Sequence, residues 1–155
     1  MQRITPFLWF DKQAEEAANY YVSIFPNSRV VSLTRYTKES SAASGQAEGS
    51  VMTAAFELDG QPLTALNGGP IFKFNEALSL VVHCHDQDEI DHFWETLSAG
   101  GDANAQACGW LKDKYGLSWQ IVPEDIDELV KNPGSVAALM QMKKIDVAAM
   151  KAAAT

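Results

Sequence analysis

The sequence has few cysteines, few basic residues and no long apolar run, and each of these absences excludes a class of protein. Two cysteines, Cys84 and Cys108, are too few for a disulfide framework. Twelve Lys and Arg against 20 Asp and Glu give a formal charge of −8 at pH 7, with no basic cluster, so we expect no nucleic-acid partner. No apolar run reaches membrane-spanning length, and the amino terminus lacks a signal-peptide pattern. We therefore expect a cytoplasmic protein without a membrane partner.

The composition is that of an ordinary globular protein. Of the 155 residues, 46% are hydrophobic and 21% are charged, which is enough apolar mass for a core. This length allows one or two small, closely packed modules, and a single compact unit is the default expectation.

The first half of the chain alternates between patterns typical of strands and of a helix. Helical spacing of apolar residues predicts a helix over residues 14–25, and Asp11 is expected to cap its amino terminus. Residues 37–50 are rich in Ser, Ala and Gly and have no periodicity, which predicts a mobile loop long enough to cover a site. Apolar or alternating runs predict strands over residues 3–10, 28–36, 51–58 and 61–66.

The second half repeats this order of elements. A strand is predicted over residues 78–84, and a helix follows from Asp86 or Asp88 to Leu97. Residues 102–106 are poorly marked, and strands are predicted over residues 107–112 and 117–122. We therefore predict an α+β fold of two βαβββ modules, over residues 1–70 and 71–123, followed by a helical tail over residues 124–155.

The clearest local pattern is a β-hairpin over residues 110–123. In its second strand Leu117, Trp119 and Ile121 alternate with a second set that contains Gln120. An amide on a mostly apolar face must find a partner, which is a ligand, a neighbouring side chain or water. Gln120 is therefore the strongest candidate for a ligand contact. Trp110 and Cys108 share one alternation on the first strand, so both are expected to line the same surface.

Four phrases of the sequence resemble one known family. The chain is similar to the PhnB-like branch of the vicinal oxygen chelate (glyoxalase/bleomycin-resistance/dioxygenase) superfamily, whose members often carry a 3-demethylubiquinone 3-methyltransferase label. The resemblance implies two βαβββ modules whose mixed sheets form a cup, usually in a homodimer. The phrases that carry it are residues 4–11 (ITPFLWFD), 15–21 (EEAANYY), 24–28 (IFPNS) and 109–123 (GWLKDKYGLSWQIVP).

The resemblance also implies where a metal ion would bind. In metal-using members each module supplies one ligand from its first strand and one from its last, and these positions correspond to Ile4, Leu63 or Ala65, Leu80, and Gln120. None is a histidine or a carboxylate, and a lone neutral amide is a weak ligand. We therefore predict no metal site. No other cofactor is expected, because no glycine-rich turn for a methyl-donor cofactor follows the first predicted strand.

The remaining candidates for chemistry are histidines and cysteines. On a strand His83 and His85 face away from Cys84, so the three cannot chelate one ion, and Cys84 is expected to be a small buried apolar residue. Cys108 has no histidine near it in the sequence to activate its thiol. The candidate ligand contacts are Gln120, Trp110, Cys108, Cys84, Leu80 and Ile4.

Three functions are compatible with these patterns. The leading hypothesis is a metal-free protein of the glyoxalase/bleomycin-resistance type that binds a small, partly aromatic molecule in the cup. The second is an enzyme, a transferase or lyase acting on a quinone-like or small phosphonate-type substrate, with His83, Cys84, Glu39 or Glu48 as its general base. The third is a purely structural or regulatory dimer.

Overall fold

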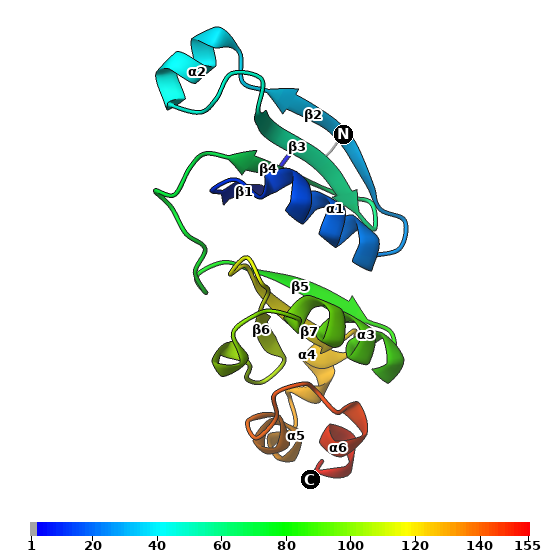
Figure 1. Ribbon diagram of the computed structural model, residues 1–155. Helices are drawn as coiled ribbons and strands as arrows, with labels where there is room; N and C mark the ends of the chain where they lie inside the picture. Colours follow the sequence, from blue (N-terminus) through cyan, green and yellow to red (C-terminus); the bar gives the residue numbers. More distant parts are fainter. Residues whose placement is uncertain (1–2) are drawn as a thin grey trace. The chain divides into compact units, whose positions relative to one another are not determined.

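The computed structural model of this protein describes residues 3–155 and confirms the α+β class (Figure 1). The chain divides into two compact units, the first ending at Lys73 and the second running from Phe74 to Thr155. Each unit has its own mixed sheet and its own helices. None of the helices within residues 3–155 has the length and apolar character needed to cross a membrane.

The first unit is a βαβββ module with one additional helix. Its four strands lie in the order β1-β4-β3-β2, with β1 parallel to β4 and the other neighbours antiparallel. The first strand begins at Phe7 rather than at Arg3, directly after Pro6, which has no N–H to donate. The elements are β1 (Phe7–Phe10), α1 (Ala14–Ile24), β2 (Arg29–Arg35), α2 (Lys38–Ser44), β3 (Val51–Leu58) and β4 (Gln61–Asn67).

Helix α1 packs against one face of this sheet through small side chains. Ala14, Ala17 and Ala18 are fully buried, so the helix approaches the strands closely. The strand residues that alternate toward the core include Leu8 and Phe56.

The amino terminus of α1 is not capped by Asp11, and this prediction was wrong. The N-cap residue is Gln13, whose side chain makes no capping hydrogen bond. Instead the Ala14 N–H donates to Oδ1 of Asn67, at the end of β4, over 2.8 Å. An acceptor from a strand 53 residues away takes the place of the local cap.

Residues 37–50 are not a structureless loop, which corrects the second local prediction. They contain α2, whose Thr37 side chain accepts from the Ser40 N–H while the Ser40 side chain accepts from the Thr37 N–H. Gly45 ends the helix with a φ of 77°. Because α2 buries no residue, it carries no apolar periodicity from which a helix could be predicted.

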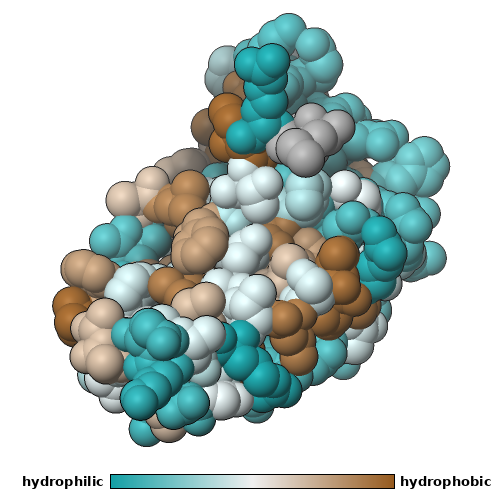
Figure 2. Space-filling model, turned by 90° about the horizontal axis from the view of Figure 1, so that it is seen from above, coloured by the Kyte–Doolittle hydropathy of each residue, from teal (hydrophilic) through white to brown (hydrophobic). Residues whose placement is uncertain are grey.

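Large apolar side chains of the first unit stay exposed. Figure 2 shows hydrophobic residues, in brown, at the surface among hydrophilic ones. The exposed apolar side chains of this unit are Ile4, Phe7, Val31, Leu33, Ile71 and Phe72.

The second unit repeats the pattern with one strand fewer. Its sheet has the order β5-β7-β6, with β5 parallel and β6 antiparallel to β7. Residues 102–106 contain a 3-10 helix where the repeat predicts a strand, because the Asp102 side chain accepts from the Asn104 N–H and turns the chain. The elements are β5 (Ser79–Cys84), α3 (Gln87–Ser98), η1 (Ala103–Ala105), β6 (Trp110–Lys112) and β7 (Ser118–Pro123). Asp86 caps α3, as predicted.

The predicted helical tail forms part of the second unit. It contains α4 (Ile126–Leu129), α5 (Pro133–Leu139) and α6 (Val147–Ala152). Ile145 and Met150 of the tail are fully buried in one cluster with Val122 of β7.

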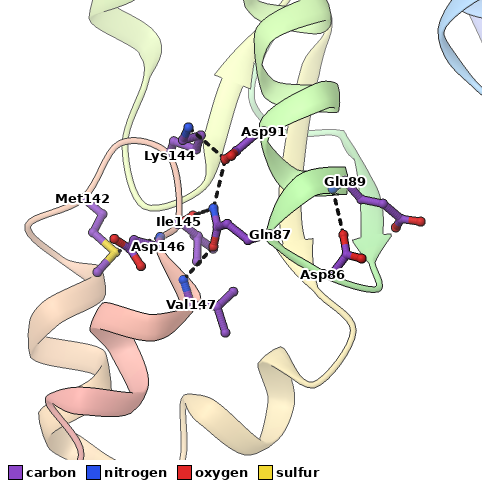
Figure 3. A network of polar contacts seen from close by, with 9 residues as sticks. All are labelled: Asp86, Gln87, Glu89, Asp91, Met142, Lys144, Ile145, Asp146 and Val147. Atoms are coloured by element: carbon purple, nitrogen blue, oxygen red, sulfur yellow. Dashed lines mark hydrogen bonds and ion pairs between the residues drawn. The ribbon is translucent and has the colours of Figure 1, made fainter.

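The side chain of a glutamine on α3 binds the backbone of the tail (Figure 3). The Gln87 Nε2 donates to the Ile145 carbonyl, and its Oε1 accepts from the Val147 N–H, both over 2.9 Å. An ion pair of 2.8 Å joins Lys144 to Asp91 one turn farther along the helix. The tail is therefore held by apolar burial and by two hydrogen bonds of the Gln87 side-chain amide.

Candidate ligand-binding face of the second sheet

The hairpin that joins β6 to β7 is organised by a buried carboxylate. Asp113 is 2% exposed, and its Oδ1 accepts from the N–H groups of Tyr115 and Leu117 over 2.9 and 3.1 Å. Its Oδ2 accepts from Trp119 Nε1 over 2.9 Å. The predicted hairpin over residues 110–123 contains Asp113, but sequence reasoning assigned this residue no role. The signal that could have identified it is an Asp three residues before Gly116, the spacing of a side-chain-stabilised turn.

The alternation along β7 separates two faces of the sheet. Leu111, Trp119 and Ile121 are buried, at 1%, 2% and 0% exposure, on the face toward α3. The register places the alternate residues of the three strands together on the other face. We call this surface the Gln120 face, defined by Ser79, Val81, Trp110, Lys112, Ser118 and Gln120.

Gln120 and Trp110 lie beside one another on this face. They are directly paired across β6 and β7, and both side chains are half-buried. The Gln120 Nε2 donates to Ser79 Oγ over 3.0 Å, which is the neighbouring-side-chain partner left open by the sequence. No residue of the described chain donates to Gln120 Oε1, so this acceptor is available to a ligand or to water.

Cys108 does not share the alternation of Trp110, which corrects one site prediction. Ala107 and Trp110 exchange backbone hydrogen bonds, so Cys108 and Gly109 form a tight turn with φ angles of 53° and 87°. The Cys108 thiol lies 3.9 Å from the Met140 sulfur of the tail. The turn, rather than a continued strand, removes Cys108 from the Gln120 face.

Leu80 and Cys84 also lie away from the Gln120 face. Successive side chains of β5 point to opposite faces of the sheet. Leu80 and Cys84 therefore point toward α3, opposite to Val81. Burial, reinforced by Glu89 and Asp86, raises the pKa of the Cys84 thiol to about 12. Ile4 belongs to the first unit, where it precedes β1 and is 84% exposed.

The residues at the implied metal positions do not fit a divalent ion. Leu63 and Ala65 are buried beneath α1, and Leu80 faces α3. Gln120 and its neighbours supply no anionic oxygen or imidazole at the remaining position. Across residues 3–155 there is no group of three or more His, Cys, Asp or Glu arranged to hold a metal.

The two strand histidines occupy different environments. His83 is exposed and pairs in register with Val122, which puts it on the side of the sheet that carries the Gln120 face. His85 follows β5, and its Nδ1 lies 3.0 Å from Glu124 Oε1. That hydrogen bond and the charges of Glu124, Asp86 and Glu89 raise the pKa of His85.

Comparison with known proteins identifies relatives of the region that contains the two sheets. The family model described as 3-demethylubiquinone-9 3-methyltransferase matches residues 2–122. A PhnB protein from Bacillus cereus, provisionally called a 3-demethylubiquinone-9 3-methyltransferase, is 37% identical, with a TM-score of 0.67, over 78% of this chain and 99% of that chain.

A second solved structure supports the fold alone. Protein PA1353 from Pseudomonas aeruginosa is 16% identical, with a TM-score of 0.59, over 79% of this chain and 98% of that chain. No curated protein matches this chain. The predicted resemblance to the PhnB-like branch is confirmed, and the tail beyond residue 122 lies outside the matched family region.

Proposed function

We propose that this chain, which belongs to the 3-demethylubiquinone-9 3-methyltransferase family and resembles its PhnB-like members, is a metal-independent binding protein of the glyoxalase/bleomycin-resistance type. Its ligand is a small, partly aromatic molecule held on the Gln120 face. The observation that carries this proposal is the cross-strand pair of Trp110 and Gln120. Together they offer a flat apolar ring beside an unpaired amide oxygen.

This pair suits a ligand with a ring and a hydrogen-bond donor. An aromatic ring stacked on the Trp110 indole contributes about 0.5–1.5 kcal/mol beyond its buried area. A donor on Gln120 Oε1 contributes about 0.5–1.5 kcal/mol. Each contact alone therefore changes the dissociation constant by roughly twofold to twelvefold.

Two substitutions test the binding hypothesis. We expect Trp110→Ala and Gln120→Leu each to reduce or abolish the thermal stabilisation that aromatic compounds give the wild-type protein. Gln141→Leu, at an exposed position of the tail, is the matched control and should keep the wild-type response. Undiminished stabilisation in both site variants would remove the Gln120 face as the binding surface.

An enzyme acting on the same face is the second candidate. The exposed imidazole of His83 on this side of the sheet favours it, since a general base must reach a substrate. Cys84 is unsuitable because its thiol is buried and has a pKa of about 12. Neither Glu39 nor Glu48 belongs to the second unit.

A substitution of the base distinguishes this enzyme from a binding protein. For a transferase or lyase acting on a quinone-like or phosphonate-type substrate, His83→Ala should lower turnover by roughly a hundredfold or more while leaving the fold intact. Wild-type turnover in His83→Ala would exclude His83 as the base.

We also propose that the protein is a cytoplasmic homodimer. The exposed apolar side chains of the first unit, such as Phe7 and Phe72, support self-association. The free thiols of Cys84 and Cys108 suit a reducing compartment. Native mass spectrometry tests the assembly, and cell fractionation tests the location.

A further inference from the structure

A cavity of about 310 Å³ lies at one end of the Gln120 face. All of its lining residues belong to the second unit, and they include Glu76, Asp102, Asn104, Trp110, Lys112 and Ser118. Trp110 therefore borders both this cavity and Gln120. This volume is at the lower end of the range of small-molecule pockets, which is enough for the polar end of a ligand whose ring lies on the indole.

Ser118 lines this cavity with a hydroxyl group that makes no hydrogen bond within the protein. The residue is 1% exposed, and its Oγ is buried without a hydrogen-bond partner among the described residues. Buried hydroxyl groups are almost always hydrogen-bonded, because an unpaired one loses its interaction with water without compensation. A hydroxyl in this state that lines a cavity is therefore a candidate partner for a polar atom of a ligand or for a water.

A cation lies next to this hydroxyl. Lys112 is directly paired with Ser118 across β6 and β7, so both side chains emerge on the same face. The Lys112 side chain is only 27% exposed, and its Nζ lies 3.1 Å from Glu76 Oε2. Lys112 is the one basic residue in the lining of this cavity.

Glu76 is a weakly held partner for that cation. Its side chain is 66% exposed and belongs to the segment that precedes β5 rather than to the sheet. Water competes effectively for an ion pair of this kind. The second acidic residue, Asp102, is already engaged, since its Oδ1 accepts from the Asn104 N–H over 2.9 Å. Its negative charge still opposes a bound anion.

We propose that this cavity binds the anionic oxygen group of an aromatic ligand, through Lys112 Nζ and Ser118 Oγ, while the ring lies on Trp110. Glu76 is the counter-ion that the ligand's own carboxylate, phosphonate or phenolate displaces. This inference rests on the proposed binding function and adds the charge of the ligand to it. Lys112 and Ser118 then determine specificity, and Trp110 and Gln120 supply the general affinity.

A matched pair of probes isolates the charge. We would titrate the wild-type protein with 2-naphthoate and with its neutral isostere 2-naphthamide, by calorimetry or by NMR. The readout is the ratio of the two dissociation constants. A charge-assisted hydrogen bond to Lys112 should favour naphthoate by roughly tenfold.

Four variants assign that ratio to individual groups. Lys112→Met should abolish the preference for naphthoate, and Lys112→Arg should keep most of it, which separates lost charge from lost folding. Glu76→Gln should increase the preference, because the competing carboxylate is gone. Ser118→Ala should reduce it. Circular dichroism checks that each variant is folded.

The outcomes separate this inference from the proposal on which it rests. If naphthamide binds and Trp110→Ala weakens it, but naphthoate is not preferred, the Gln120 face binds aromatic molecules and the anion site is wrong. A preference that survives in Lys112→Met also overturns the anion site. If neither probe binds, the proposed function fails and this inference fails with it.

Discussion

One buried carboxylate, Asp113, holds the hairpin that presents Trp110 and Gln120. It is the only buried carboxylate among residues 3–155. It accepts hydrogen bonds from two backbone N–H groups and from the Trp119 indole. A carboxylate buried so fully is tolerated because donors surround it.

Replacing Asp113 should therefore destabilise the whole second unit. Asp113→Ala removes the acceptor that three donors share, and we expect it to lower the free energy of unfolding by about 3 kcal/mol or more. Asp127→Ala, at an exposed position of α4, should change stability by less than about 0.5 kcal/mol. Urea denaturation measures both. Equal stability of the two variants would show that Asp113 is not a structural centre.

The exposed pair of His85 and Glu124 provides a pH-dependent observable. Because Glu124 raises the pKa of His85, the folded state favours the protonated imidazole. Any stabilisation from the pair is complete below the ordinary histidine pKa of about 6.5 and is lost as the pH rises through the raised value. We expect NMR titration to show His85 losing its proton at a higher pH in the wild type than in Glu124→Gln. Identical titration curves would contradict this interpretation.

At the scale of secondary-structure elements, the tail supports the turn that precedes Trp110. The N–H groups of Cys108 and Gly109 donate to the Met142 and Lys143 carbonyls, both over 2.8 Å. An added Cβ on Gly109 would lie 2.8 Å from the Ile145 side chain. The tail therefore stabilises a turn in which both central residues have positive φ.

A pair of glycine substitutions separates this contact from backbone strain. Gly109→Ala combines a positive φ with the clash against Ile145, whereas Gly116→Ala has a similar φ of 89° and open space around it. We expect Gly116→Ala to cost about 1 kcal/mol in unfolding free energy and Gly109→Ala clearly more. Gly109→Ala should also shift the NMR signal of the Trp110 indole. Equal costs would mean that the tail does not restrain the turn.

The sequence predicts elements whose stabilising partners are nearby in the chain. The alternation of β7 separates Gln120 from Trp119 correctly, and Asp86 caps α3 as expected, because both patterns are local. The cap of α1 could not be predicted in this way, since its acceptor is Asn67 of a distant strand. The turn at Cys108 was also missed, since a strand pattern continues through a tight turn without a change in hydrophobicity.

At the scale of the whole molecule, the doubled sequence pattern predicts the two-sheet α+β fold. The second sheet nevertheless has three strands where the first has four, and its unit includes the helical tail. The family match stops at residue 122. The hydrogen bond from Gln87 to the Ile145 carbonyl therefore joins the matched region to a segment outside it. Family likeness therefore accounts for the sheets, and the tail is an addition of this chain to the matched region.

Metal-independent binding on the Gln120 face is most directly tested by an NMR titration. Protein labelled with ¹⁵N would be titrated with 2-naphthamide, with and without EDTA, while the indole signals of its four tryptophans and the side-chain amide of Gln120 are followed. We predict that the signals of Trp110 and Gln120 shift with one dissociation constant, unaffected by EDTA, while the buried Trp119 indole changes little. Shifts confined to other residues, or binding abolished by EDTA, would contradict this account.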